Sequence, residues 1–140
     1  MIKKHGANMQ TALALDTNAY SALQRGSAKQ LIELVNKTSD IALTLVVIAE
    51  LKAGFKKGSQ TNQNRAKLAR FLQDPRVSIL IPDEQTAETY AELWSELATK
   101  GNPIPTNDVW IAALCLQHGY TLATSDQHFD NVPLLQIIGF

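Results

Sequence analysis

The sequence has one cysteine and no long hydrophobic run. Cys115, the single cysteine, cannot form a disulfide within the chain, which suits a reducing compartment such as the cytoplasm. No stretch of about 18 apolar residues is present to cross a bilayer. The basic start, residues 1–6, is not followed by a long apolar stretch, which argues against a secretory signal. These absences predict a cytoplasmic protein that does not associate with membranes.

The sequence also lacks an excess of charge of either sign, because 13 lysines and arginines balance 13 aspartates and glutamates. Acidic residues are absent from residues 51–73, which carry six basic residues: Lys52, Lys56, Lys57, Arg65, Lys67 and Arg70. A solvated helix face would explain this segment. Phosphate contact by part of it, with Lys52, Lys56 and Arg65 as candidates, is the alternative, because basic clusters attract nucleic-acid backbones.

The length and composition indicate one domain. The chain has 140 residues, of which 45% are hydrophobic, and domains with their own core usually have roughly 100–200 residues. We expect residues 9–140 to form this domain and residues 1–8 to be a flexible N-terminal extension. Apolar strand-like segments alternate with amphipathic helical ones, a pattern typical of an α/β fold with a mostly parallel sheet covered by helices.

Individual strands and helices are predicted from apolar periodicity and from the residues that end each segment. The run over 41–48 is apolar almost throughout; its first half fits a strand and its second half a helix, and periodicity leaves the boundary open. Residues 58–64 are polar, which predicts a loop. The other predicted strands cover 12–15, 77–81, 120–124 and 134–138. The other predicted helices cover 17–24, 65–73, 83–100 and 107–118, and one more helix is expected after Ser27, with this serine as its cap.

Four carboxylates lie where an ordinary surface acid is not expected. Asp16 and Asp126 follow predicted strands, whereas Glu50 and Asp108 lie within or at the start of predicted helices. Each has an ordinary explanation: a cap or turn for the two aspartates after strands, favourable interaction with the helix dipole for Asp108, and a rim position for Glu50. The helical neighbours of Glu50 and Asp108 are small or apolar, however, which favours side chains that face a cleft.

The four carboxylates are more informative together than singly. In a parallel α/β sheet, the carboxyl ends of the strands and the amino ends of the helices that follow lie at one edge. Carboxylates that converge there raise one another's pKa, and a hard cation such as Mg²⁺ would bind their oxygens. The histidines His5, His118 and His128 are too scattered, and Cys115 too isolated, to indicate zinc. An acidic, metal-filled pocket suits phosphodiester hydrolysis by metal-activated water.

Four short motifs follow one another along the chain. They are Leu-Asp-Thr-Asn at 15–18, Val-Val-Ile-Ala-Glu-Leu-Lys-Ala-Gly at 46–54, Pro-Thr-Asn-Asp-Val-Trp-Ile-Ala-Ala at 105–113 and Ala-Thr-Ser-Asp-Gln-His-Phe-Asp at 123–130. Their order resembles that of the PIN-domain ribonucleases, and within them the chain is most similar to the VapC-type toxins of prokaryotic toxin–antitoxin pairs. The resemblance implies a three-layer α/β/α sandwich and a Mg²⁺- or Mn²⁺-dependent endoribonuclease, the toxin of a type II pair.

The resemblance also implies a role for each acidic residue. Asp16 and Asp108 match the positions expected to hold the metal directly, and Glu50 and Asp126 match positions that act through water or a second ion. Together the four are the candidate catalytic residues, and attack on phosphorus would leave a 5′-phosphate and a 3′-hydroxyl. Asp130 is a nearby alternative for the fourth position; we favour Asp126 because it directly follows the predicted strand.

The remaining implications concern supporting residues and partners. Asn18 and Thr124 match polar positions that brace the site. The expected partners are an RNA substrate, a second copy of the chain in a homodimer, and a VapB-like antitoxin whose tail blocks the pocket, often with an arginine. Two alternatives stay open: a PIN-like nuclease of RNA maturation or DNA processing, and a non-catalytic binding module with the same fold.

Overall fold

A central sheet organises the computed structural model, which describes residues 12–140. The expectation for residues 1–8 lies outside the described residues. The strands are β1 (Ala12–Leu15), β2 (Asp40–Thr44), β3 (Val77–Leu80), β4 (Thr121–Ala123) and β5 (Ile137–Ile138). The helices are α1 (Thr17–Arg25), α2 (Lys29–Lys37), α3 (Leu45–Lys57), α4 (Thr61–Leu72), α5 (Glu84–Thr99), α6 (Thr106–His118) and a short 3₁₀ helix, η1 (Gln127–Asn131).

Within the described residues the sheet is entirely parallel, with the strand order β3-β2-β1-β4-β5. β1 lies at its centre, where Leu13 pairs with Ile41 of β2 on one side and with Thr121 of β4 on the other. The sequence of β1 is Ala-Leu-Ala-Leu, and its last three residues are fully buried. A strand covered on both faces by helices is apolar on both faces, which explains why this segment shows no polar alternation.

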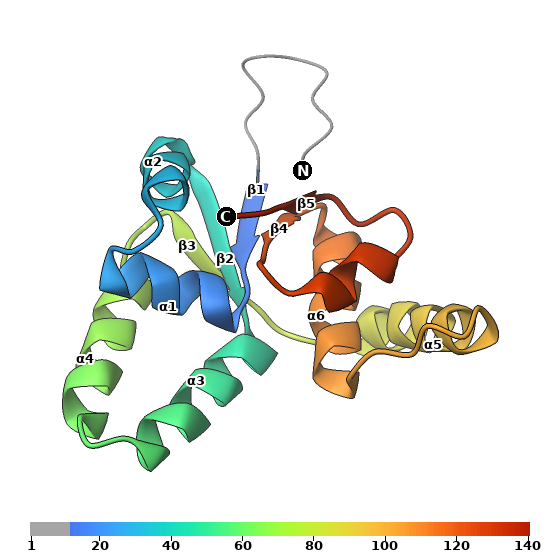
Figure 1. The fold of residues 1–140 in the computed structure, drawn as a ribbon, viewed down its shortest axis with the longest axis horizontal. Helices are drawn as coiled ribbons and strands as arrows, with labels where there is room; N and C mark the ends of the chain where they lie inside the picture. The colour runs from blue at the N-terminus through green and yellow to red at the C-terminus, as the bar shows by residue number, and fades with distance from the viewer. Residues whose placement is uncertain (1–11) are drawn as a thin grey trace.

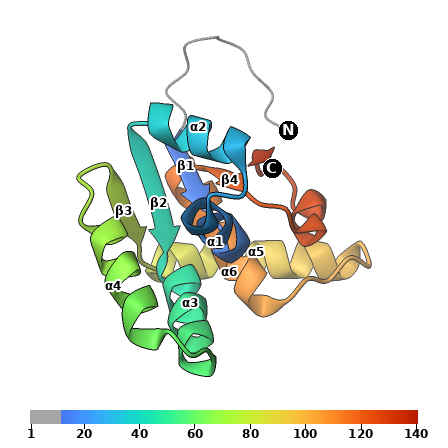
Figure 2. The same ribbon diagram turned by 60° about the vertical axis from the view of Figure 1, so that its left-hand side comes forward.

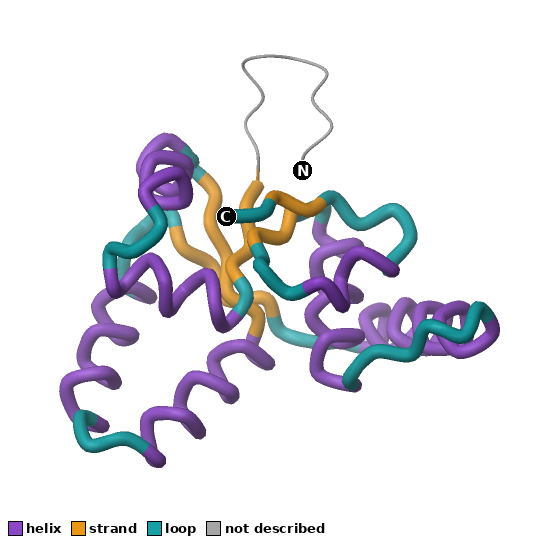
Figure 3. The backbone as a smooth tube through the Cα atoms, in the orientation of Figure 1, coloured by secondary structure: helices purple, strands orange, loops and turns teal. Residues whose placement is uncertain are grey.

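Helices cover both faces of the sheet. Figures 1 and 2 show α1, α2 and α4 on one side of the strands and α5 and α6 on the other, and Figure 3 shows the strands gathered between them. α5 packs on α6, where the rings of Tyr90 and Trp110 stack with centroids 4.3 Å apart. The predicted three-layer α/β/α fold is therefore confirmed. None of the helices between residues 12 and 140 is long and apolar enough to span a bilayer.

The apolar run over 41–48 changes from strand to helix between Thr44 and Leu45. The Thr44 hydroxyl accepts a hydrogen bond from the Val47 backbone N–H at 3.1 Å and so caps α3. Apolar periodicity could not locate this boundary because the first turn of the helix is as apolar as the strand, although Leu45 is 44% exposed. As a result, β2 leads without a loop into α3, the helix that carries Glu50.

The loop predicted over 58–64 is shorter than expected, because α4 begins at Thr61. The Thr61 hydroxyl donates a hydrogen bond to the Phe55 carbonyl oxygen at 2.6 Å, which ties the start of α4 to the end of α3. The first turn of α4 is largely exposed. Its polar composition therefore reflects solvent contact rather than the absence of a helix.

Two other local predictions are also wrong. The final strand is limited to Ile137–Ile138, and Leu134, the residue where it was expected to begin, has a φ of 67°. That left-handed conformation lies outside the strand region. Ser27 does not cap α2, because its hydroxyl donates instead to the Ala22 carbonyl oxygen of α1 at 3.4 Å.

Candidate functional site

Four carboxylates line one cavity of about 410 Å³ at the edge of the sheet where β1, β2 and β4 end: Asp16, Glu50, Asp108 and Asp126. Asp16 directly follows β1, and Glu50 lies on α3, which continues from β2. Asp108 lies in the first turn of α6, and Asp126 is the residue before η1. The structure therefore brings together four acids from four segments that are distant in sequence.

Asp16 is the acid most deeply buried in this cavity, with 5% of its surface exposed. One carboxylate oxygen accepts a hydrogen bond from the Ala19 N–H at 2.8 Å and caps α1, and the other accepts from the Thr124 hydroxyl. Burial raises the pKa of Asp16; the two hydrogen bonds oppose this rise, and the charges of Asp126 and Asp108 add to it. The charged form of Asp16 is thus held at a net cost in free energy.

Thr124 connects two of the site's segments through one hydroxyl group. Buried at 3% exposure directly after β4, it donates to Asp16 and accepts a hydrogen bond from the Asp126 backbone N–H at 2.9 Å. This arrangement fixes the carboxylate after β1 relative to the turn that carries Asp126. Asn18, the other polar residue expected to brace the site, is exposed and lines the same cavity.

Glu50 is oriented by neutral donors from the two helices next to it. The Thr17 hydroxyl at the start of α1 donates to one carboxylate oxygen at 2.5 Å. The Asn107 side-chain amide at the start of α6 donates to the other at 3.1 Å. Both donors are uncharged, and they direct the Glu50 side chain toward the cavity that it lines.

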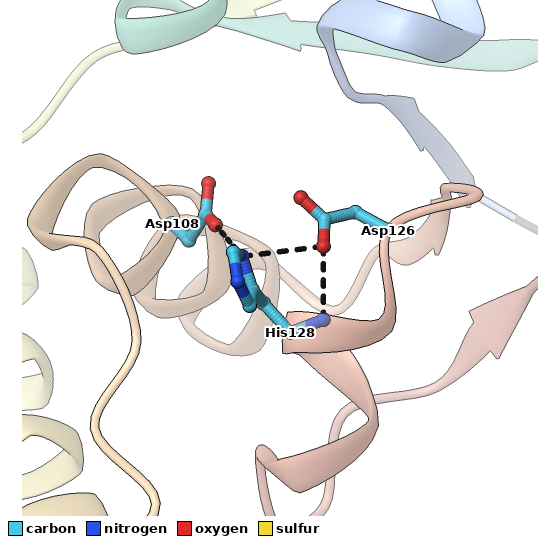
Figure 4. A group of neighbouring side chains, drawn as sticks. All are labelled: Asp108, Asp126 and His128. Atoms are coloured by element: carbon cyan, nitrogen blue, oxygen red, sulfur yellow. Dashed lines mark hydrogen bonds and ion pairs between the residues drawn. The ribbon is translucent and has the colours of Figure 1, made fainter.

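Asp108 and Asp126 share one imidazole nitrogen (Figure 4). His128 Nδ1 lies 3.0 Å from Asp108 Oδ2 and 3.2 Å from Asp126 Oδ1. The His128 backbone N–H also donates to Asp126 Oδ1 at 2.9 Å, so Asp126 caps η1. Burial raises the pKa of Asp108; the contact with His128 opposes that rise, and the charges of Asp126 and Glu50 increase it.

Four polar residues of the site were not singled out from the sequence as site residues: His128, Asn107, Thr17 and Lys57. His128 was set aside with the other histidines as too scattered, yet it lies only two residues after Asp126 and a 3₁₀ turn folds it back. A histidine within one turn of a candidate carboxylate was the available signal. Lys57 lines the cavity from the last turn of α3, and only the three-dimensional packing distinguishes it from the neighbouring lysines.

Other candidate residues lie away from the cavity lining. Lys52 and Lys56 on α3 and Arg65 on α4 are exposed, and none of the three is among the lining residues. Asp130, the alternative to Asp126, is exposed on η1 and likewise does not line the cavity. Of the two aspartates after β4, Asp126 is therefore the one placed beside Asp16 and Asp108.

The donor set fits a divalent cation. In the described part of the chain no lysine or arginine forms an ion pair with any of the four acids. Oxygen atoms of Asp108 and Asp126 and a ring nitrogen of His128 lie within 4.8 Å of one another. Carboxylate oxygens are the ligands preferred by Mg²⁺, and imidazole joins carboxylates in many transition-metal sites.

Known proteins resemble this chain over most of its length. A model of the PIN domain family matches residues 13–135. Ribonuclease VapC2 of Rickettsia felis is 35% identical over 105 residues, which cover 74% of this chain and 77% of that protein, and ribonuclease VapC5 of Mycobacterium tuberculosis is 30% identical over 127 residues, which cover 89% and 92%. The crystal structure of VapBC2 from Rickettsia felis bound to a promoter DNA fragment matches with a TM-score of 0.79 and 31% identity, covering 91% of this chain and 97% of that chain. The chain belongs to the PIN-domain family and, within it, to the VapC ribonucleases.

Proposed function

We propose that this chain is a divalent-metal-dependent endoribonuclease that acts as the toxin of a type II toxin–antitoxin pair. The observation that carries the proposal is the convergence of four carboxylates on one cavity, with no lysine or arginine of residues 12–140 paired to them. The raised pKa of Asp16 and of Asp108 indicates that the fold holds these charges at a cost. A cation that binds there offsets this cost and serves phosphodiester hydrolysis.

The acids divide into two roles in this proposal. Asp16 and Asp108 would hold Mg²⁺ or Mn²⁺ directly, and Glu50 and Asp126 would hold its waters or a second ion. When bound, a divalent cation supplies a water of lowered pKa and neutralises charge that develops on the scissile phosphate. Either Glu50 or Asp126 would orient the attacking water and accept its proton.

The products follow from the atoms exchanged. The water oxygen adds to phosphorus, the bond from phosphorus to the 3′ oxygen breaks, and that oxygen takes up a proton. The cut RNA then carries a 5′-phosphate and a 3′-hydroxyl. Thr124, Thr17 and Asn107 hold Asp16 and Glu50 in place before substrate arrives, which reduces the reorganisation required during the reaction.

Basic residues around the cavity suit an RNA backbone. Lys57 lines the cavity and would contact the phosphate next to the one that is cut. Lys52, Lys56 and Arg65 are exposed on α3 and α4 and would contact phosphates further along the strand, because such contacts are electrostatic and need no fixed geometry. The proposal therefore predicts that cleavage weakens as the salt concentration rises.

The proposed partners are a second copy of the chain and a VapB-like antitoxin. The antitoxin is supported by solved relatives that are VapBC structures, among them VapBC2 from Rickettsia felis bound to a promoter DNA fragment and VapBC-1 from nontypeable Haemophilus influenzae. An arginine in the antitoxin tail would suit the cavity of this chain, because four carboxylates without a lysine or arginine partner among the described residues attract a guanidinium as they attract a metal ion.

The test uses the full chain, purified free of any antitoxin, with RNA and DNA of matched sequence. With Mg²⁺ or Mn²⁺, we expect internal cuts in RNA that leave 5′-phosphate and 3′-hydroxyl ends, and we expect DNA to stay intact. EDTA should stop the cleavage. Sequencing of transcripts cut after induction in cells would identify the target RNA.

Two outcomes would favour the alternative functions. Cleavage of DNA at a rate similar to that of RNA would indicate a different nuclease with the same pocket. If Asp16→Asn changed neither growth toxicity nor RNA cleavage and the chain bound no divalent ion, the enzyme proposal would fail. A non-catalytic binding module would then be the better account.

A further inference from the structure

The imidazole of His128 occupies a position that the nuclease proposal does not explain. Its Nδ1 atom lies 3.0 Å from Asp108 Oδ2 and 3.2 Å from Asp126 Oδ1, whereas the protein donors to Asp16 and Glu50 are hydroxyls and amides. Figure 4 shows the ring directed toward both carboxylates, which come from different segments. The nitrogen atom is thus close to two proposed metal-site oxygens at once.

Local structure fixes the backbone that carries this ring. Asp126 caps η1 by accepting the His128 backbone N–H, which folds the chain back by one turn immediately after β4. The next residue, Phe129, is 1% exposed and anchors η1 in the core. Because residues 126 and 129 are both held, the backbone of His128 is fixed beside the two carboxylates.

The distances from His128 Nδ1 to the two carboxylate oxygens match those between ligands around one ion. Two ligands about 2.1 Å from a cation and on adjacent octahedral positions lie about 3.0 Å apart. The nitrogen-to-oxygen distances of 3.0 and 3.2 Å agree with this spacing, and the ligand atoms of all three residues lie within 4.8 Å of one another. A cation could therefore be bound with small adjustments of the side chains.

We propose that His128 Nδ1 is a direct ligand of the divalent ion and that it makes the site prefer Mn²⁺ to Mg²⁺. Asp108 would bind the same ion, and Asp126 would bind it directly instead of through water. This inference rests on the proposed function because it concerns the same ion. In the neutral tautomer that carries its proton on Nε2, Nδ1 presents a lone pair to the ion. The His128 side chain is 50% exposed, so Nε2–H can donate to water.

The preference for Mn²⁺ follows from the chemistry of the donors. Mg²⁺ favours oxygen ligands and retains several waters, so that a nitrogen ligand adds little to its binding. Mn²⁺ also binds carboxylate and water oxygens, but as a first-row transition ion it binds an imidazole nitrogen more strongly than Mg²⁺ does. A set of two carboxylates and one imidazole therefore discriminates between the two ions, whereas a set of four carboxylates discriminates less.

The decisive experiment detects the nitrogen ligand itself. The full chain, without a polyhistidine tag, is loaded with one equivalent of Mn²⁺ and studied by pulsed electron paramagnetic resonance. We expect a directly coupled ¹⁴N signal in the wild type and in His118→Gln, whose histidine lies at the other end of α6. We expect no such signal in His128→Gln, which keeps a side chain able to donate hydrogen bonds but lacks the imidazole.

Calorimetric titration gives an independent measurement on the same variants. His128→Gln should lower Mn²⁺ affinity by about 10-fold or more, the size expected for loss of a group in a metal site, and should lower Mg²⁺ affinity less. No Mn²⁺ binding, no ¹⁴N coupling in the Mn²⁺-loaded wild type, or an unchanged Mn²⁺-to-Mg²⁺ preference in His128→Gln would each overturn the inference. A ¹⁴N signal in a protein that does not cut RNA would support this ligand and would count only against the nuclease proposal.

Discussion

The acidic residues at the amino ends of the strands are held in a different way from those in the cavity where β1, β2 and β4 end. At the amino ends of the strands, Asp40 accepts a hydrogen bond from the Tyr120 hydroxyl at 2.7 Å. Asp74 pairs with the Arg76 guanidinium through both carboxylate oxygens, at 3.2 and 3.0 Å. At the carboxyl ends, four carboxylates share one cavity, and their donors are hydroxyls, amides and a single imidazole.

The carboxyl pKa of Asp74 is shifted in the opposite direction to those of Asp16 and Asp108. Hydrogen bonds from Arg76 lower the pKa of Asp74, whereas burial and neighbouring acids raise the pKa of Asp16 and of Asp108. A lowered carboxyl pKa means that the fold favours the charge, and a raised pKa means that the fold holds the charge at a cost. The chain therefore supplies partners to acids that serve the fold and leaves charge uncompensated where a cation is proposed to bind.

The largest effect is expected from Asp16→Asn at the carboxyl end. Asparagine is also a good helix cap, so its side-chain oxygen can still accept the Ala19 N–H and the protein should fold. Loss of groups that only support a metal ligand costs about 10–100-fold in affinity or activity, so removal of the proposed ligand should slow RNA cleavage by more than about 100-fold. Initial cleavage rates and thermal melting of the purified variant provide the measurement.

Asp16→Ala is the matched variant, because it removes both the charge and the cap. Loss of the cap should cost about 1 kcal/mol of stability, so Asp16→Ala should melt below Asp16→Asn while both are inactive. If Asp16→Asn instead melted far below the wild type, the main role of Asp16 would be structural rather than ion binding.

A smaller loss is expected from Thr124→Val, which keeps the shape of the side chain and removes its hydroxyl. That hydroxyl donates to Asp16 and accepts from the Asp126 N–H, so the substitution loosens two acids at once. We expect Mn²⁺ affinity and RNA cleavage to fall about 10–100-fold. Thr124→Ser retains the hydroxyl and should remain close to the wild type; equal losses in both variants would contradict a role for the hydrogen bonds.

The parallel sheet and the place of Asp16 could be predicted from sequence because both follow from the burial of β1 on its two faces. β1 (Ala12–Leu15) is buried on both faces, so it must be apolar, and the first polar residue after it therefore marks the end of the strand. The same reasoning applies to β4 (Thr121–Ala123) and the polar residues that follow it. Strand ends in a parallel sheet share one edge, so their polar residues could be placed together before any coordinates were known.

Other features depended on contacts that a linear pattern does not contain. The start of α4 depends on the Thr61 hydroxyl bound to the Phe55 carbonyl, a contact between two helices. His128 faces Asp108, which is 20 residues away in sequence, and the local chain alone does not show that these two residues meet. Lys57 differs from Lys56 only in the direction in which α3 points its side chain into the cavity.

At the amino end, Arg76→Ala should lower stability without affecting ion binding. The guanidinium donates to the carbonyls of Val35 and Thr38 at 2.9 and 3.1 Å and to Asp74, which joins the end of α2 to the start of β3. Because the pair is partly exposed, we expect the melting temperature to fall by only a few degrees. Thermal melting and Mn²⁺ titration of the variant provide the measurement, and weakened Mn²⁺ binding would show that the two ends are not independent.

The pH dependence of that variant has a definite sign. The pKa of Asp74 is lowered from its ordinary value of 3.8, so the stability it contributes is present above that value and lost as the pH falls through the lowered pKa. The difference in melting temperature between the wild type and Arg76→Ala should therefore narrow in acid. The difference should not vanish, because the hydrogen bonds from Arg76 to the Val35 and Thr38 carbonyls do not titrate. Asp74→Asn keeps these two hydrogen bonds, so most of its difference in melting temperature from the wild type should be the part that is lost in acid.

The smallest change in melting temperature is expected from Asp108→Asn in EDTA at neutral pH. This variant also tests most directly whether the site acids and Asp74 differ in how the fold holds their charge. Burial and the charges of neighbouring acids disfavour the ionised Asp108, and an asparagine oxygen can still accept a hydrogen bond from His128 Nδ1, so removal of the charge should raise the melting temperature slightly. Saturating Mn²⁺ should reverse the order, because a ligand at 100 times its dissociation constant stabilises the form that binds it by about 2.7 kcal/mol. The variant lacks a proposed ligand and gains less. An Asp108→Asn variant that is less stable than the wild type in EDTA would mean that the fold favours this charge as it favours that of Asp74, and the contrast between the two ends of the sheet would not hold.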